Sequence, residues 1–106
     1  MSLFYEYDPR LPFDPIALFT RCIENGSDSL LLDETTLPPE FFDLSSQLLG
    51  ELLHKLSVYQ MHLAIVISDI TDHSPNFQSF AHEANKGGKI RIFPTRQEAI
   101  GWLESV

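Results

Sequence analysis

The chain has 106 residues, a length that fits one domain over residues 1–106 and leaves no room for two. Hydrophobic residues make up 43%, so a core can form without disulfides or metal. The one cysteine, Cys22, has no partner for an internal disulfide, which indicates a reducing compartment and a place in the core. With neither a leader pattern nor an apolar run long enough to span a membrane, we expect a cytoplasmic protein without membrane contact.

The net charge of −8 is unevenly spread. Between Arg21 and Lys55 there is no lysine or arginine, but the acids are Glu24, Asp28, Asp33, Glu34, Glu40, Asp43 and Glu51. Basic residues gather only near the C-terminus, at Lys86, Lys89, Arg91 and Arg96. A phosphate backbone would be repelled by most of this chain, so we expect no nucleic-acid partner.

In chain order, the aromatic-rich segment from Leu3 to Tyr7 predicts a first strand. Asp14 before Pro15 is typical of a helix start, and Asn25-Gly26 of its end. Between them the apolar residues at helical spacing are Ile16, Phe19 and Ile23. The apolar run from Ser29 to Asp33 predicts a strand covered on both faces.

The loop from Glu34 to Phe42 contains Pro38-Pro39 and cannot be helical throughout. We expect Asp43 to cap the next helix. That helix carries one apolar stripe, made of Leu44, Leu48, Leu49, Leu52, Leu53 and Leu56. The run from His62 to Ser68 predicts a buried strand.

Ser74-Pro75 predicts a third helix, which Gly87-Gly88 ends. Its expected inner face consists of Phe77, Phe80, Ala81 and Ala84. A last strand follows from Lys89 to Phe93. Thr95 with Glu98 then forms a capping box for a final helix. That helix is expected to bury Ala99, Ile100, Trp102 and Leu103.

The resulting order, βαβαβαβα with short connections, predicts a single α/β domain. We expect a four-stranded, mainly parallel sheet with the helices packed on it. The sequence does not specify the order of the strands.

The second half of the chain resembles a bacterial family catalogued as domain of unknown function 4180. The resemblance covers about Pro39 to Leu103, and the first third matches only in layout. It differs at Ser46-Gln47, where the family has Thr-Gly, and at Val58-Tyr59, where the family has Asn-Tyr. The matching residues are Phe41-Phe42-Asp43-Leu44, Gly50-Glu51, Lys55, Tyr59, Ala64-Ile65-Val66, Asp69, Phe80, Glu83-Ala84-Asn85-Lys86-Gly87, Glu98-Ala99 and Trp102-Leu103. The family implies a fold and no activity.

The layout is also similar to the STAS domains of bacterial anti-sigma-factor antagonists, which place a phosphorylated Asp-Ser-Ser-Gly segment at a helix start. The corresponding residues here are Asp43-Leu44-Ser45-Ser46-Gln47. A leucine separates Asp43 from the serines, the glycine is missing, and so is the leading hairpin strand. The likeness is an analogy of layout.

Two interpretations fit Asp43, Ser45 and Ser46. In the first, these residues cap a helix, because such side chains accept hydrogen bonds from unpaired N–H groups. They also fit a phosphorylation switch or an anion site, because a helix start favours negative charge.

A second group of polar residues follows the ends of predicted parallel strands, at the sheet edge where ligands commonly bind. These residues are Asp33, Glu34, Ser68, Asp69 and Asp72. They fit solvated loop acids or a Mg²⁺ site. Pro94-Thr95 stands where a metal-dependent phosphoacceptor would need a basic residue, and this counts against the metal.

The remaining candidates favour structural roles. The four histidines lack the spacing of a helical metal site and are interpreted as surface residues: His54, His62, His73 and His82. Glu83 and Asn85 are the most specific polar match to the family, and Asn85 also fits a helix cap.

We therefore expect a binding or regulatory module rather than an enzyme, with no cofactor and no metal. The leading hypothesis is a protein partner docking on the loop from Glu34 to Ser46 and the start of the next helix. The alternative is a small-ligand or anion site formed by that helix start with Asp33 and Asp69. A third is an enzyme using those acids with Mg²⁺. The sequence leaves open whether the chain forms a homodimer.

Overall fold

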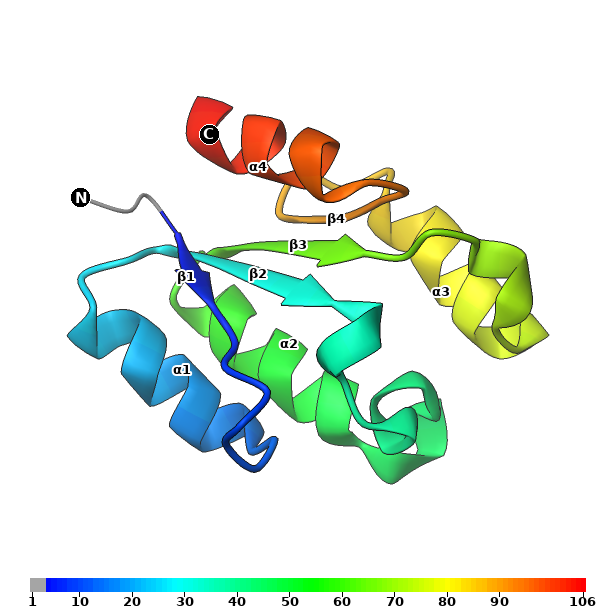
Figure 1. The fold of residues 1–106 in the computed structure, drawn as a ribbon, viewed down its shortest axis with the longest axis horizontal. Coiled ribbons are helices and arrows are strands. Elements are labelled where there is room, and N and C mark those ends of the chain that lie inside the picture. The colour runs from blue at the N-terminus through cyan, green and yellow to red at the C-terminus, as the bar shows by residue number, and fades with distance from the viewer. Residues whose placement is uncertain (1–3) are drawn as a thin grey trace.

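The computed structural model describes residues 4–106 and contains one four-stranded sheet, all parallel, in the order β1-β2-β3-β4 (Figure 1). The strands are β1 (Tyr5–Glu6), β2 (Ser29–Asp33), β3 (His62–Val66) and β4 (Ile90–Phe93). Leu3, expected to begin the first strand, lies outside the described residues. The predicted α/β fold with alternating strands and helices is confirmed.

Four helices cover the sheet: α1 (Pro15–Glu24), α2 (Leu48–Val58), α3 (Pro75–Ala84) and α4 (Arg96–Ser105). Because the chain adds each strand beside the last in the same direction, right-handed crossovers place α1, α2 and α3 on one face. The last helix, α4, follows no further strand and packs on the opposite face (Figure 1). No helix within residues 4–106 is long and apolar enough to cross a membrane.

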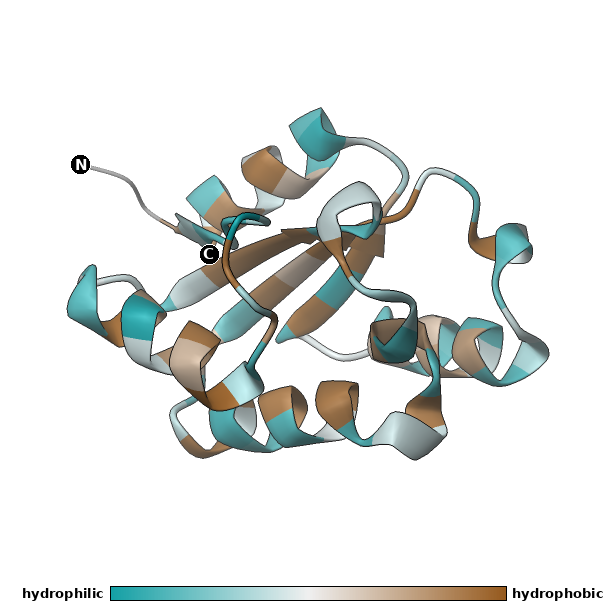
Figure 2. Cartoon of the chain, turned by 60° about the horizontal axis from the view of Figure 1, so that its bottom comes forward, coloured by the Kyte–Doolittle hydropathy of each residue, from teal (hydrophilic) through white to brown (hydrophobic). Residues whose placement is uncertain are grey.

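The larger core lies between the sheet and the first three helices. Leu30, Leu32, Leu63 and Ile65 project from the strands toward this side and are fully buried. Figure 2 shows the apolar strands lying over α1 and α2. The helices contribute Leu18, Cys22, Leu49, Leu52, Leu56 and Phe77. Cys22 is fully buried, as expected.

The smaller core lies under α4. The strand residues on this face are Leu31, Ala64 and Val66, and the helix adds Ala99 and Leu103. Because successive strand residues point to opposite faces, the apolar runs of β2 and β3 supply both cores.

Three helix starts match the sequence signals. Asp14 Oδ1 accepts hydrogen bonds from Ile16 N and Ala17 N at the start of α1. Ser74 caps α3, and Thr95 accepts from Glu98 N at the start of α4. The expected inner face of α1 is wrong in part, because Ile16 and Ile23 are 56% and 47% exposed.

The expected cap of the second long helix is wrong. Asp43 caps a 3₁₀ turn, η3 (Leu44–Ser46), and α2 begins only at Leu48. Between them Gln47 adopts the left-handed conformation, with φ 68°, which breaks the helical path. Leu44 therefore leaves the leucine stripe and is 39% exposed. Leu49, Leu52 and Leu56 are buried, as predicted.

Candidate functional site

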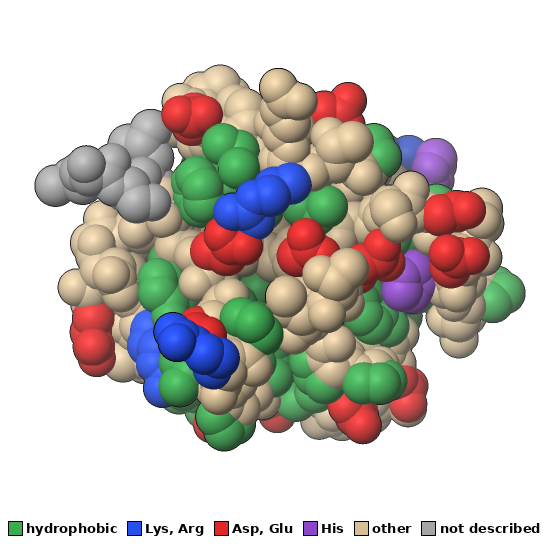
Figure 3. Space-filling model, viewed as in Figure 1, with side chains coloured by type: hydrophobic (Ala, Val, Ile, Leu, Met, Phe, Trp, Pro, Cys, Tyr) green, Lys and Arg blue, Asp and Glu red, His purple; other side chains and the backbone are tan. Residues whose placement is uncertain are grey.

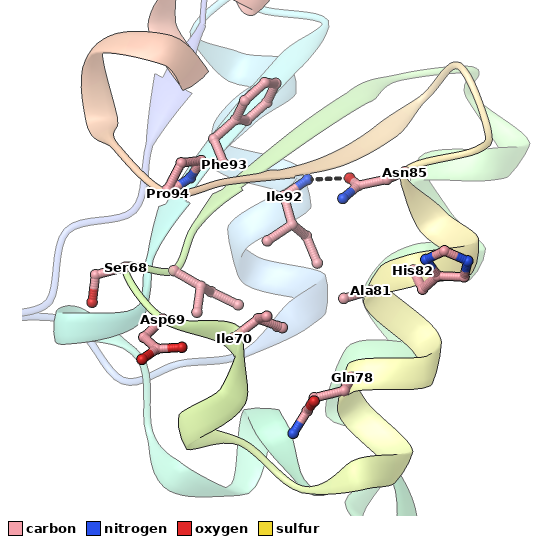
Figure 4. Close-up of a pocket in the computed structure, with 11 residues that line it drawn as sticks. Ser68, Asp69, Ile70, Gln78, Ala81, His82, Asn85, Ile92, Phe93 and Pro94 are labelled. Carbon is pink, nitrogen blue, oxygen red and sulfur yellow. Dashed lines mark hydrogen bonds between the residues drawn. The ribbon is translucent and has the colours of Figure 1, made fainter.

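A cavity of about 530 Å³ lies between α3 and the carboxyl ends of β3 and β4 (Figure 4). Its apolar part is formed by Ile67, Ile70, Ala81, Ile92, Phe93 and Pro94. Its polar part consists of Ser68, Asp69, Gln78, His82 and Asn85. The volume falls within the range of small-molecule sites in proteins.

The topology explains why a cavity forms here. After β3 the chain turns through η4 (Ile70–Asp72) to α3 on one face, whereas after β4 it turns to α4 on the other. Two adjacent parallel strands whose connections leave in opposite directions open a crevice at their carboxyl ends. The side chains at this edge therefore have space in front of them.

Three polar side chains of the cavity are partly engaged by the fold itself. Asn85 Oδ1 accepts a hydrogen bond from Ile92 N at 2.7 Å. Gln78 Nε2 donates to His73 O at 2.7 Å, and Asp69 Oδ1 accepts from Thr71 N and Thr71 Oγ1. The amide nitrogen of Asn85, the amide oxygen of Gln78 and Oδ2 of Asp69 have no hydrogen-bond partner within residues 4–106.

Beside the cavity, Glu34 joins the ends of β2 and β3. Its Oε1 accepts from Ser68 N at 2.9 Å and from Ser68 Oγ at 2.8 Å, and its Oε2 lies 3.0 Å from His73 Nε2. Burial raises the pKa of Glu34, but the hydrogen bonds from the Ser68 backbone, the His73 ring and the Ser68 hydroxyl together lower it below its usual value. Glu34 is thus an ionised structural link.

His73 is not a plain surface histidine, contrary to the expectation. Its side chain is only 15% exposed, and its ring stacks on Phe42 with centroids 4.4 Å apart. Its carbonyl also holds Gln78, a cavity residue. The hydroxyl of Ser68 bonds to Glu34 rather than to His73, so these residues do not form a hydrolytic triad.

Ser45 and Ser46 differ in their environments. Ser45 is exposed, and its Oγ donates to Asp43 Oδ1 at 2.6 Å. Ser46 is half-buried, and its Oγ donates to Glu40 O at 2.6 Å. The side-chain and backbone hydrogen bonds from Ser45 lower the pKa of Asp43.

A shallow, mainly apolar groove of about 490 Å³ borders this turn. Its lining runs from the start of α1 to Lys55 in α2 and comprises Ile16, Leu44, Gln47, Gly50, Glu51, His54 and Lys55. The groove therefore lies at the start of α2, next to the segment that the sequence singled out.

The other candidates do not join one site. Asp33 caps the 3₁₀ turn η1 (Glu34–Thr36), accepting from Thr35 N and Thr35 Oγ1. Glu83, near the end of α3, pairs with Lys86 just beyond the helix. Asn85 holds the outer edge of β4, so its role in the fold is larger than a helix cap. Of the predicted residues, Ser68, Asp69 and Asn85 line the cavity.

The described residues contain no group of three or more His, Cys, Asp or Glu side chains placed to hold a metal ion. Burial, the main cause, and the charge of Asp28 raise the pKa of Cys22 to about 11, so its thiol is protonated at neutral pH. A buried, protonated thiol is a poor nucleophile.

Reasoning from the sequence missed Gln78 and the role of His73. Because Ser74-Pro75 indicated the start of α3, Gln78 could have been recognised from the sequence as a polar residue in the first turns of that helix. The contact between His73 and Glu34 joins residues 39 positions apart, and no local pattern reports it.

The chain belongs to the family described as Domain of unknown function (DUF4180), which it matches over residues 12–103. The match begins at Pro12 and therefore includes α1 and β2, more than the resemblance of the second half alone. No curated protein and no solved structure matches the chain. The likeness to STAS domains accordingly stays a prediction.

Proposed function

We propose that this chain is a non-enzymatic regulatory domain that binds a partner protein in the groove between α1 and α2. The observation that carries the proposal is that α1, α2 and the segments joined to them carry several exposed apolar side chains, of which Ile16 and Leu44 line the groove. The exposed apolar side chains are Ile16, Ile23, Leu44, Val58 and Tyr59, each at least 39% exposed. An exposed apolar groove is a feature that protein interaction sites often have.

The groove suits a helix or an extended segment that presents an apolar ridge. Ile16 and Leu44 form apolar walls, and Gly50 keeps the side of α2 low, because its Cβ position faces open space. Glu51 and Lys55 supply polar edges. An apolar centre with a polar rim is the usual composition of a protein interface.

The turn of Asp43, Ser45 and Ser46 supports a regulatory role for the groove. A phosphate on Ser45 would replace a donor to Asp43 with a dianion beside an ionised carboxylate. Repulsion would open the turn and move Leu44, a groove wall, so partner binding would weaken. The exposed Ser45 suits modification better than Ser46, whose hydroxyl is bound to Glu40 O.

The anion-binding alternative has less support at this place. The first helical turn of α2 starts after Ser45 and Ser46, and Gln47 separates them from it. The small-ligand part of that alternative rests on the cavity beside β4, which is a separate surface.

The proposal is tested by affinity capture from the cells that naturally produce the chain, followed by quantitative mass spectrometry. The bait is compared with the double variant Ile16→Ser/Leu44→Ser. Val106→Ser is the matched control, because its side chain is 54% exposed and lies beyond the end of α4. We expect a protein that the wild type and the control retain and the double variant loses. Identical capture by all three baits would refute the groove as the binding surface.

Sedimentation of the purified chain tests whether the groove is occupied by a second copy of the chain. A dimer that the double variant abolishes would assign the groove to self-association instead of a different partner. With a purified partner, the loss of two exposed apolar contacts should weaken binding roughly tenfold or more.

A further inference from the structure

The cavity beside β4 has a distinct chemical character that the groove does not share. Its polar groups with unused hydrogen-bonding capacity include two acceptors, Oδ2 of Asp69 and the amide oxygen of Gln78. Hydrogen bonds from the Thr71 hydroxyl and then its backbone N–H lower the pKa of Asp69, so this carboxylate carries its charge at neutral pH.

Residues 4–106 place no lysine or arginine in the walls of the cavity. Among the residues that line it, His82 and the amide of Asn85 can donate hydrogen bonds. The chain as a whole carries a net charge of −8, and acidic side chains are spread over the face shown in Figure 3. This field disfavours phosphates and carboxylates and attracts cations.

The deeper walls are apolar. Ile67 and Ala81 are buried, and Ile70 and Ile92 are half-buried and face the same space (Figure 4). Ile92 is fixed by the bond from its N–H to Asn85, which ties the edge of β4 to the end of α3. Such walls favour a flat or branched apolar body.

We propose that this cavity binds a small amine, with its ammonium group at the carboxylate of Asp69 and its apolar body against Ile70 and Ile92. The amine donates to Oδ2 of Asp69, which the hydrogen bonds of the fold leave available. The apolar part of the amine moves out of water into the space between α3 and the strand ends. The site is independent of the groove between α1 and α2, because the two share no lining residue.

Three probes of similar shape and different charge test the proposal: phenethylamine, 2-phenylethanol and phenylacetate. Each is titrated into the ¹⁵N-labelled full chain and followed by the amide shifts of residues 67–70, 78–85 and 92–94. For probes of this size we expect weak binding, roughly millimolar to tens of millimolar, strongest for the amine. Equal or tighter binding of phenylacetate at these residues would overturn the assignment, as would the absence of shifts with phenethylamine.

Asp69→Asn keeps the shape and the acceptor for Thr71 but removes the charge. It should weaken phenethylamine binding about three- to fivefold, as expected for an exposed ion pair, and leave 2-phenylethanol unchanged. Asp72→Asn is the matched control, because Asp72 is an exposed neighbour outside the lining. Unchanged amine binding by Asp69→Asn, or an equal loss in Asp72→Asn, would refute the role of Asp69.

A filled cavity gives a second readout. Ala81→Met places a longer side chain in the space, and it should reduce the shifts from all three probes while its circular dichroism spectrum stays that of the wild type. If this variant does not fold, the Asp69→Asn comparison alone decides the proposal. The variants of Ile16 and Leu44 should bind phenethylamine normally, so a failed groove and a failed cavity are distinguishable.

Discussion

Replacing Glu34 with glutamine removes the charge that joins β2 to β3 and keeps the shape of the side chain. The carboxylate accepts three hydrogen bonds, two from Ser68 and one from His73. Its side chain is 20% exposed, so solvent replaces these bonds only in part. Hydrogen bonds to a charged group are about twice as strong as neutral ones, and we expect Glu34→Gln to lower the free energy of unfolding by roughly 1–2 kcal/mol at pH 7.

The pH dependence of this effect has a definite sign. The folded-state pKa of Glu34 lies below the ordinary value of 4.5, so its ionised form stabilises the fold above that pH. This stabilisation is lost as the pH falls through the folded-state pKa. The difference between wild type and Glu34→Gln should therefore be largest near pH 7 and shrink toward zero in acid.

Urea unfolding of both proteins between pH 7 and pH 3.5, followed by circular dichroism, measures this difference. Glu83→Gln is the control, because the side chain of Glu83 is 73% exposed, and it should stay within about 0.5 kcal/mol of wild type. A Glu34→Gln protein as stable as the control at pH 7 would refute the structural link. So would a difference that does not change with pH.

Three further predictions concern the core, the thiol and the sheet edge. Leu52→Ala should lower the free energy of unfolding by roughly 2–5 kcal/mol, because Leu52 is fully buried, whereas Leu44→Ala should lower it by less than about 0.5 kcal/mol. Chemical denaturation measures both values, and equal losses would contradict the placement of η3 outside α2. Cys22 should react with a thiol reagent only after denaturant is added, because burial raises its pKa to about 11, and rapid labelling of the native chain would contradict its burial. Asn85→Ala should destabilise the chain by about 1 kcal/mol and speed amide exchange at Ile92; unchanged exchange there would show that Asn85 does not hold this edge.

Local signals in the sequence were enough for most of the elements. Asp14-Pro15 and Thr95 with Glu98 mark the starts of α1 and α4 because each satisfies unpaired N–H groups within its own turn. Asp43 shows the same signal and also accepts from a residue two positions on, but the chain then bends at Gln47. Glutamine rarely adopts the left-handed conformation, so nothing at this position indicated the break.

The candidate site was harder to predict from the sequence because its residues come from segments that are far apart in the chain. Asp69 and Ser68 were expected at a strand end, and they lie there. The cavity depends on the order of β3 and β4 and on the departure of α3 and α4 to opposite faces, which alternation of strands and helices alone does not specify. Gln78 and the amide nitrogen of Asn85 are the neutral polar groups of the cavity, and only that geometry identifies them as parts of a site.

Hydrogen exchange with the captured partner tests the proposed binding surface most directly. Amide exchange is measured for the chain alone and in complex, and for Ser45→Asp as a substitute for the phosphorylated form. We expect slower exchange on complex formation in α1 and in the segment from Leu44 to Lys55, and at least several-fold weaker binding by Ser45→Asp. Protection confined to α4 or to the outer edge of β4, with the groove exchanging as in the chain alone, would contradict it.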